Sequence, residues 1–234
     1  APSRYYADRM IECLGIPAEK MRVIYNGINL EGYEPENHIP NPPVLGFFSR
    51  MCRDKGLDVV VDAFIALKKN NRIPNLKLRI GGGCGPGDEL FVKELRDKLH
   101  AKALLGDVDF QLNLSRLEKQ EFLRSLSVLT VPAQFGESFG FYVIEAMAAG
   151  VPVVQPHCAS FPDLIEITGG GITYEPTDRE TLTVTLEKFL CDLGKARKLG
   201  QVGREAVREK FSIDTMAQKV ASLFEEISSA KASA

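Results

Sequence analysis

One glycine-rich stretch of the sequence, residues 136–150 (GESFGFYVIEAMAAG), carries two carboxylates, Glu137 and Glu145. Glu145 lies in the apolar part of this stretch, where an unpaired carboxylate costs free energy unless something hydrogen-bonds to it. The sequence leaves two kinds of partner open. They are the neutral hydroxyls of a ligand, such as those of a ribose, or a backbone group or lysine of the protein itself.

Two basic residues, Arg50 and Lys55, lie in the segment SRMCRDKG after a predicted strand. Each could be a solvated surface charge, although Lys55 precedes a helix whose dipole repels a cation. Together they could bind an anion, arginine through its planar fork and lysine as a point charge. The free amides of a helix that begins near Phe141 also favour an anion, and Gly136 and Gly140 permit close backbone approach. We therefore expect both cations and this helix start to surround one phosphorylated ligand.

A second glycine-rich segment, GGGCGPG at 81–87, fails two nucleotide-binding motifs. No register places glycines at i, i+2 and i+5, which disfavours NAD. Gly82 and Gly87 have the spacing of an NTPase phosphate loop, but Asp88 and Glu89 stand where lysine and serine or threonine are required. Two interpretations remain: a tight turn with Asp88 capping the next helix, or a loop close to phosphate or sugar.

These loops must be positioned by the elements around them. Between Val44 and Tyr174 short apolar runs alternate with helical patterns, which predicts βαβ units and a doubly wound parallel α/β sheet of Rossmann-like type. Ligands of such sheets lie at the carboxyl ends of the strands. The predicted strands are VLGFFS, LKLRIG, VDF, VLTVP, VPVVQP and ITY, and the predicted helices include LDVVVDAFIALKKN, DELFVKELRDKLHAKAL, SRLEKQEFLRSL and FYVIEAMAAG.

Boundaries follow from composition. Residues 1–30 are predicted to be the end of another domain, and the proline-rich segment 31–43 a linker. Residues 44–211 form the predicted Rossmann-like domain, and 212–234 a C-terminal helix and tail. The opening APSRYYADRM is not a signal peptide, and we expect it to be a cut inside a longer polypeptide.

Composition excludes several classes of protein. A hydrophobic content of 44%, a charged content of 26% and a net charge of −2 indicate a globular chain without the basic field of a nucleic-acid binder. No apolar run approaches the roughly 18 residues of a membrane span. The cysteines have no metal-binding spacing, so we expect reduced thiols, no bound metal and a cytoplasmic location.

The motifs in this order resemble one known family. ESFGFYVIEAMAAGVPVV, with seven residues between Glu137 and Glu145, resembles the E-x7-E signature of retaining glycosyltransferases of the GT-B fold, specifically glycosyltransferase family 4 (group 1). VLGFFSRMCRDKGLDVVVDAF resembles its phosphate loop, and REAVREKFSIDTMAQKVASLFEEI its closing segment. The resemblance covers the whole chain. It implies the C-terminal domain of a GT-B fold with extra C-terminal helices, and an absent N-terminal domain that binds the acceptor.

The resemblance also implies roles for matched residues. Arg50 and Lys55 would bind the donor diphosphate and stabilise it as it leaves, Glu145 would bind the ribose, and Glu137 would lie near the donor sugar. Glu137, Arg50 and Lys55 are thus the expected catalytic residues. Other positions would contact sugar, phosphate or base, mostly through the backbone: Phe139, Gly140, Phe141, Asn113 and Leu114.

The function implied is transfer of a sugar from a nucleotide diphosphate sugar to an acceptor hydroxyl with retention of configuration. A UDP-sugar is the expected donor, with GDP-sugar and ADP-sugar as alternatives, and no cofactor is expected. The chain alone should bind nucleotide without turnover. Membrane association of the parent protein is left open.

Two other functions remain as alternatives. The chain could be a non-catalytic nucleotide-binding or scaffold module, although joint retention of Arg50, Lys55, Glu137 and Glu145 argues against lost chemistry. It could also be a nucleotide-sugar epimerase of the same fold, which the loop around Glu137 disfavours.

Overall fold

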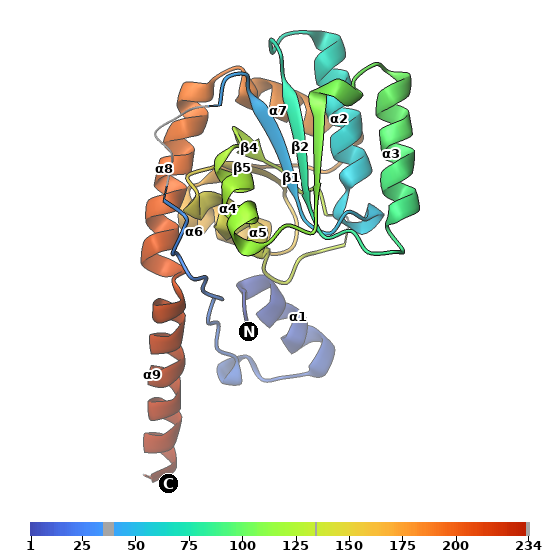
Figure 1. The fold of residues 1–234 in the computed structure, drawn as a ribbon. Coiled ribbons are helices and arrows are strands. Elements are labelled where there is room, and N and C mark those ends of the chain that lie inside the picture. Colours follow the sequence, from blue (N-terminus) through green and yellow to red (C-terminus); the bar gives the residue numbers. More distant parts are fainter. Residues whose placement is uncertain (35–39, 134, 233–234) are drawn as a thin grey trace.

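The centre of the chain is a six-stranded parallel sheet with the strand order β3-β2-β1-β4-β5-β6 (Figure 1). This structure is a computed structural model that describes residues 1–34, 40–133 and 135–232. All strand pairs in the described residues are parallel, so the doubly wound fold predicted from the sequence is confirmed. The strands are β1 (Val44–Phe48), β2 (Lys77–Gly82), β3 (Val108–Leu112), β4 (Val128–Leu129), β5 (Val153–Pro156) and β6 (Gly171–Tyr174).

Helices cover both faces of the sheet, as right-handed crossovers require. On one face α2 packs against α3 and α7, and on the other α8 packs against α5 and α6, with α4 beside α5 (Figure 1). Their bounds are α2 (Leu57–Asn70), α3 (Glu89–Ala101), α4 (Arg116–Arg124), α5 (Phe141–Ala148), α6 (Phe161–Thr168), α7 (Arg179–Leu190) and α8 (Leu193–Lys210). Short 3-10 turns are η1 (Ala18–Lys20), η2 (Arg53–Lys55) and η3 (Leu105–Asp107).

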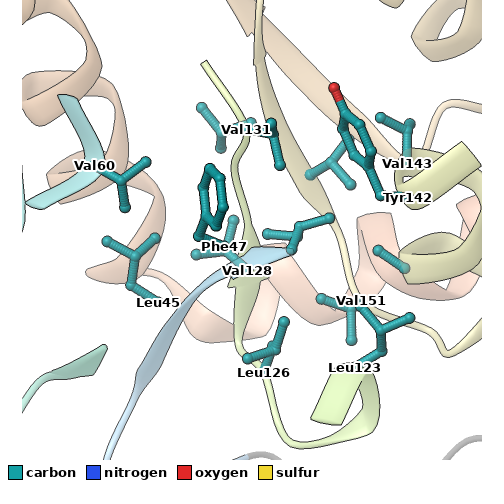
Figure 2. Packing of buried hydrophobic residues seen from close by; sticks show 14 of the residues in the cluster. Leu45, Phe47, Val60, Leu123, Leu126, Val128, Val131, Tyr142, Val143 and Val151 are labelled. Atoms are coloured by element: carbon teal, nitrogen blue, oxygen red, sulfur yellow. The ribbon is translucent and has the colours of Figure 1, made fainter. Parts of the chain in front are cut away.

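The pattern of β1 explains why this strand lies in the middle of the sheet. Successive side chains of a strand point to opposite faces, and every residue from 44 to 47 is buried. Leu45 and Phe47 turn toward Val60 of α2 (Figure 2). On the other face Leu126 lies so close to Gly46 that a side chain there would clash with it. A nearly continuous apolar run is therefore compatible with only a two-sided, central strand.

The strand order reverses between β1 and β4. From β1 the chain moves outward to β2 and β3, then returns to β4 and continues outward to β5 and β6. The loops after β1 and β4 consequently leave neighbouring strand ends toward opposite faces of the sheet. This arrangement is the switch point at which open α/β sheets bind ligands.

The residues before the sheet pack against the segments that follow β4 and β5. After α1 (Arg4–Leu14), the chain runs back toward the sheet (Figure 1). The hydroxyl of Ser3 donates to the carbonyl of Ser138 over 2.6 Å, and the hydroxyl of Tyr25 donates to Asp163 over 2.8 Å. Residues 35–39 of the predicted linker lie outside the described residues, so the proposed boundaries at 30 and 43 stay predictions.

The last helix, α9 (Ile213–Ala232), extends from the end of α8 beyond the sheet (Figure 1). Its start is stabilised by Ser212, whose hydroxyl accepts a hydrogen bond from the Thr215 amide over 3.0 Å. Among the described residues, no helix combines the length and apolar character that a membrane crossing requires.

Gly56 offers a test of how closely the loops after β1 and β4 approach each other. Its φ is 72°, and a Cβ there would collide with the carbonyl oxygen of Pro132. Gly15 has a similar φ of 63° but open space around it. We predict that Gly15→Ala lowers the free energy of unfolding by about 1–2 kcal/mol, the cost of a left-handed side chain. Gly56→Ala should cost at least about 1 kcal/mol more, because overpacking adds to that strain.

Urea denaturation of the two variants measures this difference directly. Equal losses at the two positions would contradict the close approach of Gly56 to Pro132.

Candidate functional site

An ion pair between Lys55 and Glu137 joins the loop after β1 to the loop after β4. Lys55 ends η2, and its ammonium group donates to Oε1 of Glu137. The two side chains are 27% and 15% exposed, so the pair is partly shielded from solvent. The hydroxyl of Tyr142 donates to the same Oε1 over 3.2 Å. Burial and the Glu137 carboxylate together raise the pKa of Tyr142 well above its ordinary value, which keeps this hydroxyl a donor.

The turn before α5 is fixed by hydrogen bonds to its carbonyl groups. Ser3 donates to the carbonyl of Ser138, and Ser160 donates to the carbonyl of Phe139 over 2.8 Å. Gly140 then adopts φ 93°, and α5 begins at Phe141, as the sequence predicted. The first amides of a helix have no acceptor within the helix and lie at the positive end of its dipole. This turn can therefore receive an anion beside Glu137.

Arg50, in the loop after β1, is held by the carboxylate of Asp88, at the end of the loop after β2. Its Nε and Nη2 donate to the two carboxylate oxygens of Asp88 over 3.0 and 3.1 Å. The Arg50 side chain is 66% exposed, whereas that of Asp88 is 6% exposed. The Arg50 guanidinium and the Gly85 amide stabilise the ionised form of Asp88 and lower its pKa, against the effect of burial. Within the described residues, the N–H groups on the outer edge of the guanidinium have no hydrogen-bond partner.

The interpretation of Asp88 as a capping side chain is wrong. Asp88 occupies the N-cap position of α3, but its side chain makes no capping hydrogen bond to that helix. Its oxygens bind Arg50 and the amide of Gly85 instead, the latter over 3.2 Å. The charge-assisted fork to arginine is the stronger interaction and determines the rotamer.

Asn113 fastens the glycine-rich loop that follows β2. Its side-chain oxygen accepts from the Cys84 amide over 2.9 Å, and its side-chain nitrogen donates to the Cys84 carbonyl over 3.2 Å. Its own amide donates to the carbonyl of Gly82 over 2.8 Å. Asn113 adopts φ 54°, which asparagine tolerates better than most residues. Leu114 follows and packs partly buried against the core.

Glu145 has a protein partner in this structure. Lys119 of α4 donates to its Oε1 over 2.6 Å, and the Glu145 side chain is 14% exposed. Of the two partners left open by the sequence, a lysine of the protein is the one present. This contact occupies one carboxylate oxygen of Glu145. Binding of ribose hydroxyls by Glu145 stays a prediction.

The predicted site residues thus lie at one edge of the sheet, in loops and helix starts that follow β1, β3 and β4. Lys55 and Glu137 are in direct contact, and the turn containing Phe139, Gly140 and Phe141 continues from Glu137. Arg50 contacts Asp88 instead of Glu137.

Sequence reasoning missed the partners that hold these residues. Lys119 lies in an amphipathic helix where lysines are common, so its type and spacing carried no signal. Tyr142 is the second residue of the predicted helix that follows the glycine turn. This position could have indicated a role for Tyr142 beside Glu137. The sequence indicated Asp88 as a helix cap and not as the partner of Arg50.

Similar solved structures show the fold. The chain matches sucrose-phosphate synthase from Thermosynechococcus elongatus at 24% identity and a TM-score of 0.84, covering 98% of this chain and 58% of that one. It matches HepE of Anabaena in complex with UDP at 23% identity and a TM-score of 0.84, covering 97% and 63%. The C-terminal domain of the group 1 family protein LpcC from Francisella tularensis matches at 23% identity and a TM-score of 0.69, covering 80% and 100%. The fold is that of a GT-B glycosyltransferase C-terminal domain.

The sequence assigns the family. The family described as glycosyl transferases group 1 matches residues 33–206, and the chain belongs to it. A D-inositol 3-phosphate glycosyltransferase from Streptomyces bingchenggensis is 28% identical over 94% of this chain and 50% of its own length. A GDP-mannose-dependent mannosyltransferase of phosphatidylinositol monomannoside from Mycobacterium tuberculosis is 24% identical over 94% and 59%. The chain therefore spans about half the length of such relatives.

Asp88 gives the site a pH-dependent stability that can be measured. Because its folded pKa is lowered, the ionised form stabilises the fold above the unfolded aspartate pKa of about 3.9. That contribution is lost as pH falls through the lowered folded pKa. We predict that Asp88→Asn destabilises the chain at pH 7 and that the gap from the wild type shrinks as the pH falls below about 4.

Urea denaturation between pH 7 and pH 3.5 measures the difference in the free energy of unfolding between the wild type and Asp88→Asn. Asp97→Asn, in an exposed helix pair with Lys93, is the control and should cost little at any of these pH values. A gap for Asp88→Asn that is the same at every pH would contradict the assignment.

Proposed function

We propose that this chain is the donor-binding half of a retaining glycosyltransferase of family 4, which transfers a sugar from a nucleotide diphosphate sugar to an acceptor hydroxyl. The observation that carries the proposal is the contact of Lys55 with Glu137 at the β1 and β4 switch point, beside the start of α5. This contact brings a cation, a carboxylate and a set of helix amides together where ligands of such sheets bind.

The charges suit a sugar diphosphate. Lys55, the outer edge of Arg50 and the amides before Phe141 would bind the diphosphate, and Glu137 would face the sugar. In the donor complex Lys55 would turn part of its hydrogen bonding from Glu137 to a phosphate oxygen. Glu145, one helical turn further into α5, would accept hydrogen bonds from the ribose hydroxyls.

The chemistry then depends on stabilising the leaving group. As the bond between the sugar and the diphosphate breaks, negative charge grows on the phosphate oxygen, and Arg50 and Lys55 would neutralise it. The acceptor oxygen would attack the same face of the sugar, and the departing phosphate would take its proton. Glu137 would orient the sugar. No resident metal or cofactor is needed for these steps.

Two proteins similar to this one support a nucleotide diphosphate sugar as the donor. HepE of Anabaena was solved in complex with UDP, and the mycobacterial relative is named as GDP-mannose-dependent. We propose a UDP-sugar as the donor, with GDP-sugar and ADP-sugar as the alternatives to test. The acceptor would bind to the part of the protein that lies outside this chain, so this chain alone would bind nucleotide without transferring sugar.

A cytoplasmic location is part of the proposal. The cysteines of the described residues are all free thiols, which is typical of proteins in a reducing compartment.

Titration calorimetry of this chain with UDP, GDP and ADP tests the donor site. We expect one preferred nucleoside diphosphate, and we expect Arg50→Ala and Glu145→Gln each to weaken its binding by about tenfold or more, because charged hydrogen bonds contribute about 1.5–3 kcal/mol. Arg53→Ala is the matched control, since Arg53 lies in the same loop but pairs with Glu94.

Nucleotide binding that neither substitution weakens would overturn the site. Absence of binding by all three nucleotides would overturn the donor-binding function itself.

The stereochemistry is testable on the full-length protein. We predict that the glycosidic product keeps the anomeric configuration of the donor, and that Glu137→Gln lowers kcat more than it raises KM for the donor. NMR of the anomeric proton of the first-formed product identifies the configuration. A product of opposite configuration would contradict the retaining mechanism.

A further inference from the structure

The carboxylate of Glu145 lies in an environment that would not hold a charge unaided. Its neighbours along α5, Val143, Ile144, Ala146 and Met147, are all 0% exposed, and α5 packs against α4 and α8. The Glu145 side chain itself is 14% exposed. An ionised group in such a place requires a counter-ion or several hydrogen bonds.

Lys119 supplies that counter-ion. Its ammonium group donates to Oε1 of Glu145 over 2.6 Å, and its side chain is 23% exposed. In the part of the chain that the structure describes, no second lysine or arginine forms an ion pair with Glu145. Lys119 is therefore the cation that balances the charge of Glu145 in this part of the chain.

The position of Lys119 is fixed by the way α4 is held. Ser115 and Glu118 form a capping box at the start of this helix, immediately before Lys119. Further along α4, Gln120 donates to the carbonyl of Glu31 and Arg124 donates to the carbonyl of Gly32, each over 2.7 Å. Anchors on both sides of Lys119 leave its backbone little freedom.

Tyr33 approaches the same carboxylate from the segment before the sheet. Its side chain is buried, and burial and the nearby charge of Glu145 raise the pKa of its hydroxyl, while Arg116 acts in the opposite direction. Among the described residues, Lys119 forms an ion pair with Glu145, and the neutral hydroxyl of Tyr33 lies close to it. A neutral phenol is a weaker acceptor than a carboxylate for hydrogen bonds from a sugar.

From this arrangement we propose that Lys119 is a positioning residue for the donor ribose, which aims the carboxylate of Glu145 at the ribose hydroxyls. The inference rests on the proposed function, because it assigns a partner to the ribose-binding acid of that site. Lys119 acts through Glu145 and does not itself contact the reacting atoms.

The sign of the effect follows from electrostatics. Without Lys119 the carboxylate loses its counter-ion and turns toward water, so the ribose loses an aligned, charged acceptor. Hydrogen bonds to charged groups change affinity by about 10- to 100-fold. The loss should therefore fall on ligands that have ribose hydroxyls and spare those that lack them.

Calorimetry with UDP and 2′,3′-dideoxyuridine diphosphate separates these contributions. The ratio of the two dissociation constants reports the ribose hydroxyls alone, and we expect the wild-type chain to favour UDP by about 10- to 100-fold. Lys119→Met should bring this ratio to within about threefold of unity. It should weaken the dideoxy nucleotide by no more than about threefold, and Lys119→Arg should restore most of the ratio. If GDP or ADP is the preferred nucleotide, its dideoxy analogue replaces the uridine pair.

A double-mutant cycle tests whether Lys119 acts through Glu145. In a Glu145→Gln background, Lys119→Met should change the ratio by less than about twofold, because residues that act as one unit are not additive. Lys93→Met, which removes a lysine from an exposed pair with Asp97 on α3, is the matched control and should leave the ratio unchanged. Lys119→Gln retains a neutral donor and serves if Lys119→Met does not fold.

The outcomes separate this inference from the function on which it rests. A wild-type chain that binds no nucleoside diphosphate overturns the proposed function and this inference with it. If the wild type favours UDP and Glu145→Gln removes that preference while Lys119→Met or Lys119→Gln keeps it, only the role of Lys119 is overturned. Equal weakening of both nucleotides by Lys119→Met would also overturn it, because it would indicate a general effect on the fold or on phosphate binding.

Discussion

The reversal of strand order between β1 and β4 is the constraint on which the rest of the site depends. Neighbouring parallel strands deliver their loops to the same edge of the sheet, and the reversal sends those two loops to opposite faces. Lys55 comes from one loop and Glu137 from the other, and their ion pair closes the gap. Lys55 and Glu137 are 82 positions apart in the sequence, and they meet because the sheet places both loops at the carboxyl ends of neighbouring strands.

The cations at this edge are already balanced by carboxylates of the protein. Arg50 pairs with Asp88 and Lys55 with Glu137, so neither charge is held unpaired against the core. Such pairing lowers the cost of keeping partly buried charges in the free protein. It also means that an incoming anion exchanges one partner for another, so its affinity measures a difference between two ion pairs and not the full strength of either.

Much of the fold could be predicted from the sequence, because periodicity and helix signals are local. The run LDVVVDAFIALKKN forms α2 over the predicted residues, and α5 begins at Phe141. The side-chain partners could not be predicted in the same way. Lys119 meets Glu145 and Asp88 meets Arg50 only after helices and loops have packed, and nothing in the residue types distinguishes these pairs from other surface charges. The local rule that made Asp88 a helix cap was overridden by a tertiary ion pair.

Two of the hydrogen bonds that attach the segment before the sheet lie near the start of α5. The hydroxyl of Ser3 donates to the carbonyl of Ser138, and the hydroxyl of Tyr25 donates to Asp163 on α6, the helix that follows β5. Because Ser3 contacts the carbonyl of Ser138 directly, a displacement of the N-terminal residues would change this hydrogen bond without passing through the core. We therefore expect the position of the turn that carries Glu137 to depend on how the residues before the sheet are packed.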